Sequence, residues 1–173
     1  KFVHEEEIID EINDRLSKVD VDDSESLKET GKKVREMIIE AEMPEDVKED
    51  ILESYKELSK RSNEDNVSVA VRSSATAEDM PDASFAGQQE TYLHVHGEED
   101  LLKYVQKCWA SLFTDRAIFY REKNDYAHDD VLISVPVQKM VNSEKAGVMF
   151  TSHPSTGNKD QIVIEANWGL GEA

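Results

Sequence analysis

Arg72 stands where a hydrophobic strand gives way to a run of small hydroxyl residues. The stretch from Val69 to Thr76 reads VAVRSSAT. A guanidinium group offers five hydrogen-bond donors and a permanent positive charge, which suit phosphate oxygens. The hydroxyl groups of Ser73, Ser74 and Thr76 add donors, and small side chains let backbone N–H groups approach an anion. These residue types indicate a candidate phosphate site at the end of the strand.

The loop after Arg72 is acidic and carries one glycine, Gly87. A glycine there permits a tight bend or a close approach to a ligand. The structural alternative is an ion pair between Arg72 and a loop carboxylate, for which the candidates are Glu78, Asp79 and Asp82. The chain contains no G-x-x-x-x-G-K-[ST] motif, so the loop is not a P-loop. The residue types alone leave both interpretations open.

A second candidate site lies in the stretch VPVQKMV at residues 135–141. If this stretch is a strand, Gln138 and Met140 share one face, and Val137, Lys139 and Val141 share the other. A face with one amide and one soft apolar side chain suits a purine base. The structural alternative for Gln138 is an exposed strand residue without a ligand.

Apolar residues at helical spacing predict three helices in the first third of the chain. Their apolar stripes fall within residues 8–16, 27–38 and 47–58. Capping residues at 22–24 precede the second helix, and Pro44 suits the first turn of the third. The charged residues between the stripes are typical of solvated helix faces.

From residue 67 the apolar period changes to two, because Val67, Val69 and Val71 alternate with small residues and Arg72. Helices then strands with short connections predict an α+β fold with a largely antiparallel sheet. We divide the chain into a helical part, residues 1–66, and an α+β part of the same unit, residues 67–173. After residue 89 we expect a strand at 90–95, helices at 101–112 and 114–124, and strands at 131–141, 146–154 and 161–169.

Composition limits the classes of function that fit. The chain has 173 residues and a formal net charge of -18, and such a surface repels nucleic acid. One cysteine excludes an internal disulfide and fits a reducing compartment, so we expect a cytoplasmic protein. The sequence contains no apolar run of about 18 residues, so it predicts no membrane-spanning helix. The chain begins without Met, and we interpret it as a piece of a longer polypeptide.

Four sequence blocks resemble, in order and spacing, the nucleotide-binding domain of the phosphoenolpyruvate synthase (pyruvate, water dikinase) family. The blocks are VRSSATAEDMPDASFAGQQETY, CWASLFTDRAIFYR, VPVQKMVNSEKAGVMFTSHPSTG and IVIEANWGLGEA. The resemblance implies an ATP-grasp-type domain that holds ATP between two lobes. It implies that the phosphoryl group goes to a histidine on a separate swivelling domain.

The resemblance also implies roles for individual residues. It places Arg72 on the ATP phosphates as the catalytic residue, and Gly87 and Thr91 at further ATP-contacting positions. It places Gln138 in the adenine pocket, with Met140 and Val141 as a hinge whose backbone meets the base.

This chain lacks other parts that the resemblance implies. The family carries a phosphate-contacting lysine in a glycine-rich segment and Mg²⁺ ligands that we expect outside this chain, so we assign no metal ligand here. The phosphohistidine and pyruvate-binding domains would also lie elsewhere in the same polypeptide. We therefore expect the isolated piece to be inactive. A rifampicin phosphotransferase, or a non-catalytic interaction domain that kept the fold, are the alternatives.

Three other features invite a functional interpretation but favour a structural one. His153 lies in TSHP, which lacks the glycines that precede a family phosphohistidine, so we do not assign it as a phosphocarrier. Cys108 lies on the apolar stripe of its helix and is expected to be a packed thiol. His94 and His96 have no evident third ligand, so a surface pair is the better interpretation.

Overall fold

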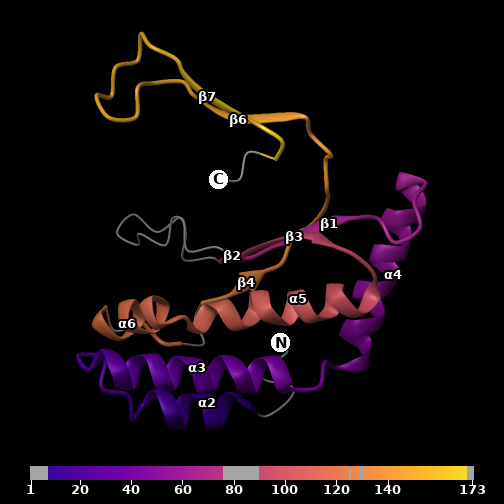
Figure 1. The fold of residues 1–173 in the computed structure, drawn as a ribbon. Coiled ribbons are helices and arrows are strands. Elements are labelled where there is room, and N and C mark those ends of the chain that lie inside the picture. Colours follow the sequence, from indigo (N-terminus) through magenta and orange to yellow (C-terminus); the bar gives the residue numbers. More distant parts are fainter. Residues whose placement is uncertain (1–7, 76–89, 125, 129–130, 171–173) are drawn as a thin grey trace. The chain divides into compact units, whose positions relative to one another are not determined.

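The computed structural model describes residues 8–75, 90–124, 126–128 and 131–170 (Figure 1). The chain divides into two compact units, Lys1–Met140 and Val141–Ala173. The boundary between these units falls within the predicted α+β part. The predicted division into a helical part, residues 1–66, and an α+β part of the same unit, residues 67–173, stays a prediction.

The predicted N-terminal helices are present as α2 (Ile8–Leu16), α3 (Ser24–Glu40) and α4 (Glu45–Ser62). The Asp23 carboxylate caps α3 by accepting the Glu25 N–H, as the capping residues predicted. Pro44 is the N-cap of α4 and therefore stands one residue before its first turn. Helix α4 is capped at its C-terminus by Asn63, which adopts a left-handed conformation with φ 53°.

Two further helices and a short 3₁₀ turn follow the first strands. They are α5 (Glu98–Ala110), η2 (Ser111–Phe113) and α6 (Asp115–Lys123). The Thr114 hydroxyl caps α6 by accepting the Ala117 N–H. Helix α5 starts after Gly97, whose φ of 81° is a conformation that favours glycine.

The strands of the first unit form two small antiparallel sheets. β1 (Val69–Arg72) lies between β3 (Thr91–Val95) and β5 (Val137–Lys139) in a three-stranded sheet, and β2 (Ser74–Ala75) pairs with β4 (Ile133–Ser134). The single sheet predicted from the sequence is therefore wrong in its continuity, whereas its antiparallel character is confirmed.

Pro136 explains why one predicted strand is divided in two. The strand predicted over residues 131–141 is two strands, β4 and β5, which join different sheets on either side of Pro136. Proline has no N–H to donate to a ladder, so a strand is readily interrupted there. After this interruption, β5 pairs with β1, whereas β4 pairs with β2.

The alternation of valines and small residues sets the core of the first unit. Val67, Val69 and Val71 are 0–1% exposed and pack in one apolar cluster with Leu101, Val105 and Cys108 of α5. Helix α5 therefore covers the valine face of the sheet, as burial of a continuous apolar face requires. A second cluster joins α2, α3, the end of α5 and η2 through Ile12, Val34, Ile38, Ala110 and Phe113.

The second unit consists of a hairpin, β6 (Lys145–Phe150) and β7 (Val163–Trp168). Its register pairs Lys145 with Trp168 and Phe150 with Val163. Both strands were predicted from the sequence. Within the described ranges, no helix is long and apolar enough to cross a membrane.

Candidate functional site

The sheet register brings four of the predicted site residues onto one face. Thr91 lies directly opposite Arg72, and Gln138 lies directly opposite Ala70. Because opposite residues in an antiparallel pair share a face, and residues two apart along a strand do too, these side chains lie on the side away from α5. The Met140 N–H donates to the Ser68 carbonyl at 2.8 Å, which extends the same register to Met140.

Arg72 is the last residue of β1, and its backbone is held in the sheet. Its N–H donates to the Pro136 carbonyl at 3.1 Å, while its side chain is exposed. Within the described residues, the guanidinium has no ion-pair partner. The proposed loop carboxylates lie in residues 76–89, outside the described part. The strand thus delivers a fixed positive charge to one end of this face.

Ser73, at the start of the loop, does not have the role that the sequence predicted. Ser73 is 4% exposed, and its hydroxyl accepts the Glu90 N–H at 2.9 Å. The Ser73 N–H donates to the Glu90 carbonyl at 2.9 Å. Ser73 therefore joins the two ends of the loop and is not an available donor for a ligand. Ser74 is a strand residue opposite Ser134.

The remaining predicted site residues differ in their surroundings. Gln138 is exposed on β5, and Met140 is half-buried just after it. Val141 is 73% exposed and belongs to the second unit. Gly87 lies outside the described residues.

Two buried side chains that were not singled out from the sequence hold β1 in place. The Tyr55 hydroxyl donates to the Val67 carbonyl at 2.9 Å and accepts the Gly97 N–H at 3.0 Å. The Ser59 hydroxyl accepts the Val67 N–H at 3.2 Å. The sequence could have indicated these contacts. Ser59 lies four residues after Tyr55 on the same apolar helix face, and a buried hydroxyl needs a hydrogen-bond partner.

A buried arginine fixes the segment after α6. Arg121 is 1% exposed and donates to the Leu112 carbonyl at 2.6 Å and to His128 Nδ1 at 2.8 Å. His128 Nε2 lies 2.7 Å from a Glu122 carboxylate oxygen. Burial lowers the pKa of Arg121 to about 10, against the opposing effect of Glu122. These contacts are satisfied within the chain, so we assign Arg121 a structural role.

The structure describes the surroundings of Cys108, His153 and His94, for which the sequence favoured a structural role. Burial, with a smaller contribution from Glu90, raises the pKa of the Cys108 thiol to about 12. His153 Nδ1 accepts the Ser155 and Thr156 N–H groups at 3.2 and 3.3 Å, which closes a turn between β6 and β7. His94 has a φ of 53° at a register shift in β3. Across the described ranges, no three His, Cys, Asp or Glu residues are grouped as a metal site.

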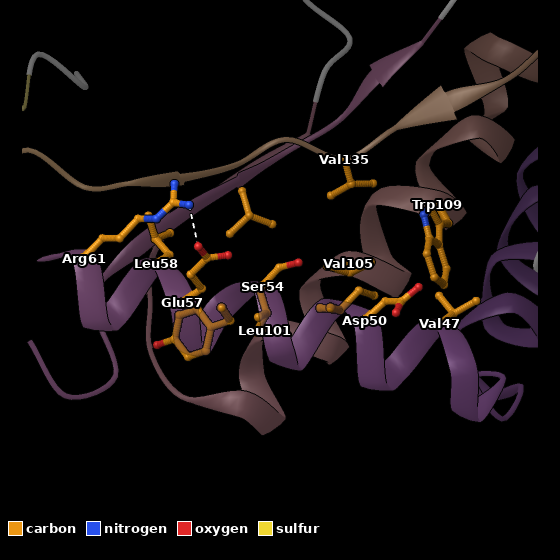
Figure 2. Close-up of a pocket in the computed structure, with 13 residues that line it drawn as sticks. Val47, Asp50, Ser54, Glu57, Leu58, Arg61, Leu101, Val105, Trp109 and Val135 are labelled. Atoms are coloured by element: carbon orange, nitrogen blue, oxygen red, sulfur yellow. Dashed lines mark hydrogen bonds and ion pairs between the residues drawn. The ribbon is translucent and has the colours of Figure 1, made fainter.

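A groove of about 630 Å³ lies on the other side of the sheet (Figure 2). It runs along α4, with Val47 near Trp109 at one end and Leu58 near Arg61 at the other. Asp50 and an ion pair between Glu57 and Arg61 add charge to its lining. Of the predicted nucleotide-contacting residues that the structure describes, none lines it. Its lining comprises Val47, Asp50, Ile51, Ser54, Tyr55, Glu57, Leu58, Arg61, Leu101, Val105, Trp109, Val135 and Val137.

Comparison with known proteins identifies the family. The family model described as "Pyruvate phosphate dikinase, AMP/ATP-binding domain" matches residues 1–173. A "Phosphoenolpyruvate synthase" from Pyrococcus furiosus is 57% identical over 164 residues, which cover 95% of this chain and 20% of that protein. A "Probable phosphoenolpyruvate synthase" from Methanocaldococcus jannaschii is 56% identical over 171 residues, or 99% of this chain and 14% of that protein.

A bacterial relative extends the match. The "Phosphoenolpyruvate synthase" of Helicobacter pylori is 49% identical over 159 residues, which cover 91% of this chain and 20% of that protein. The chain thus spans between 14% and 20% of the length of these three relatives. The resemblance of the four sequence blocks is confirmed: the chain belongs to the family of pyruvate phosphate dikinase AMP/ATP-binding domains.

Proposed function

We propose that this chain is the ATP-binding part of a phosphoenolpyruvate synthase. The full polypeptide would convert pyruvate, ATP and water to phosphoenolpyruvate, AMP and phosphate through a phosphohistidine. The observation that carries the proposal is a sheet face that gathers Arg72, Thr91 and Gln138 in a chain of an AMP/ATP-binding family. The names of the relatives favour pyruvate over rifampicin as the final acceptor.

The proposed face separates two tasks. Arg72 and Thr91, at the end of β1 and the start of β3, would meet the ATP phosphates. Gln138 and the backbone of Met140 and Val141 would meet the adenine. The arrangement supports this division because Gln138 lies opposite Ala70, two residues before Arg72, so the two tasks fall at different points along β1. In this proposal the domain is one portion of an ATP-grasp-type module, with Gly87 in the loop over the phosphates.

Arg72 would stabilise charge that moves during phosphoryl transfer. Such transfer depends on positioning and on neutralising charge at the phosphate oxygens. A cation without an ion-pair partner among the described residues can make this contact without first breaking another. Thr91 would add a hydroxyl donor on the same face.

The other parts of the reaction would come from outside this chain. The described residues do not fit a metal site, because they group no three potential ligands. We propose that the Mg²⁺ ligands, the phosphate-contacting lysine, the phosphohistidine domain and the pyruvate-binding domain lie elsewhere in the polypeptide. The single cysteine and the substrates favour the cytoplasm as its location.

Labelled nucleotide tests the proposed function directly. The full-length polypeptide is incubated with ATP labelled at the β-phosphate, and acid-labile, base-stable protein label is measured. We expect label on a histidine and its transfer to pyruvate. Label that rifampicin discharges and pyruvate does not would support the phosphotransferase alternative. A folded, ATP-binding protein that never becomes labelled would support the non-catalytic one.

His153 provides an internal control for the phosphohistidine. His153→Ala in the full-length protein should leave the amount of β-label unchanged, because His153 Nδ1 is engaged with two backbone N–H groups in an exposed turn. Peptide mapping identifies the labelled histidine. Loss of label in this variant, with an unchanged circular dichroism spectrum, would show that His153 is the carrier.

A further inference from the structure

Among the described residues, strand β5 has one unpaired edge. Within the described residues, it pairs only with β1, and β3 occupies the other side of β1. The Pro136 carbonyl accepts the Arg72 N–H of β1, and the Met140 N–H donates to the Ser68 carbonyl just before β1. Because this pairing alternates along an antiparallel strand, the N–H and C=O groups of Val137 and Lys139 point away from β1. An edge of this kind is a template for another strand.

The groove of Figure 2 lies beside this edge. Val135 and Val137 contribute one wall, and the apolar residues of α4 contribute the wall that faces them. Val137 therefore belongs to both features, since its backbone faces the open edge and its side chain lines the cavity. The volume of about 630 Å³ has room for several apolar side chains.

We propose that an extended apolar segment of the same polypeptide, from outside residues 1–173, adds to β5 as a fourth strand. Its backbone would pair with Val137 and Lys139, and its alternate side chains would fill the groove. An extended segment fits better than a helix, because a helix bonds its own backbone and would leave the edge unpaired.

The size of the relatives and the charge of the groove make the occupant more specific. The chain spans only 14% to 25% of the length of its relatives, so a long remainder of the polypeptide is available to supply the strand. The α4 wall carries apolar residues such as Ile51 and Leu58, Asp50 near Trp109, and the Glu57–Arg61 ion pair toward the other end. We therefore expect alternating apolar residues with a neutral or basic residue next to Asp50.

Photo-crosslinking in the full-length protein tests the occupant. We place p-benzoylphenylalanine at Leu58, which lines the groove, and in a matched variant at Glu53, an exposed residue of α4 outside the lining. We expect Leu58 to crosslink within one molecule to a segment outside residues 1–173, and Glu53 not to reach that segment. A crosslink to residues 1–173 or to a second copy, or no crosslink, would overturn the proposal.

Hydrogen exchange on the unmodified full-length protein tests the pairing independently of any variant. We expect the Val137 and Lys139 amides to exchange at least 100-fold more slowly than an unprotected amide, on the order of the protection of a paired strand. Exchange of both amides near the unprotected rate would show that no strand pairs with this edge.

Discussion

At the scale of single residues, Arg72 and Ser73 show what the sequence could and could not predict. The position of the Arg72 guanidinium could be predicted, because the alternation of residues along the strand places Arg72 at its end. The neighbouring hydroxyl was misassigned, because Ser73 joins Glu90 across 17 positions of sequence. A hydroxyl that suits an anion also suits a backbone N–H, and only the fold decides which is nearby. Arg72 thus remains the better candidate for ligand contact.

Cys108 allows a residue-level prediction from pH. Since burial raises its pKa to about 12, the folded state keeps the thiol neutral, whereas an unfolded thiol ionises near about 8.5. We expect negligible iodoacetamide labelling of Cys108 in the native full-length protein at pH 8, and rapid labelling in denaturant. Peptide mass spectrometry measures both.

The same pKa gives the direction of the stability change. The contribution of Cys108 to stability is full below the unfolded pKa and is lost as the pH rises toward about 12. Native-state labelling at pH 8 as fast as in denaturant would contradict a buried thiol.

At the scale of elements, local signals predicted what local interactions determine. The caps at Asp23 and Thr114 are side chains that bond within three residues, so the sequence could predict the starts of α3 and α6. The break at Pro136 follows from a single residue, yet the separate sheets depend on which strands pair at a distance. Sequence patterns give strand faces more readily than strand partners.

Tyr55 gives the element-level prediction. Its hydroxyl joins α4 to the backbone before β1 and to the start of α5, so Tyr55→Phe leaves the Val67 carbonyl and the Gly97 N–H unpaired. We expect the variant to lose about 1–3 kcal/mol in free energy of unfolding. Chemical denaturation of the full-length protein, followed by a probe of this domain, measures the loss.

Tyr104→Phe is the matched control for this prediction. Tyr104 packs its ring against Tyr92, with ring centroids 4.7 Å apart, and phenylalanine preserves that contact. We expect a change within about 0.5 kcal/mol for the control. Equal losses in the two variants would show that the Tyr55 hydroxyl does not join these elements.

At the scale of the whole molecule, the chain supplies only some of the parts that the proposed reaction needs. Its formal charge of -18 opposes an anionic nucleotide, so local cations and a metal must compensate. Arg72 is the positive charge that we assign to the site, and the described residues group no metal ligands. The family could be predicted from the order of four blocks, whereas the other parts are proposed to lie outside residues 1–173; the relatives are several times longer than this chain.

Residues 1–173 alone should therefore bind Mg-ATP weakly and show no self-phosphorylation. The physical reason is that the proposed lysine and metal contacts are absent, so little phosphate charge is neutralised. Calorimetry with Mg-ATP, with circular dichroism to check folding, makes the measurement. Sub-micromolar affinity would contradict this expectation.

The rate of phosphohistidine formation in Arg72→Ala tests the central claim most directly. Single-turnover labelling of the full-length protein with β-labelled ATP should be slower by about 10²–10³-fold, which corresponds to roughly 3–4 kcal/mol, while the affinity for adenine changes little. Arg72→Lys should restore part of the rate, because an ammonium keeps the charge but loses the planar two-pronged geometry. The assignment of this site would be contradicted if Arg72→Ala formed phosphohistidine as fast as the unmodified protein. The thermal melt of the variant would then shift only as much as the loss of a surface ion pair predicts, about 0–1 kcal/mol.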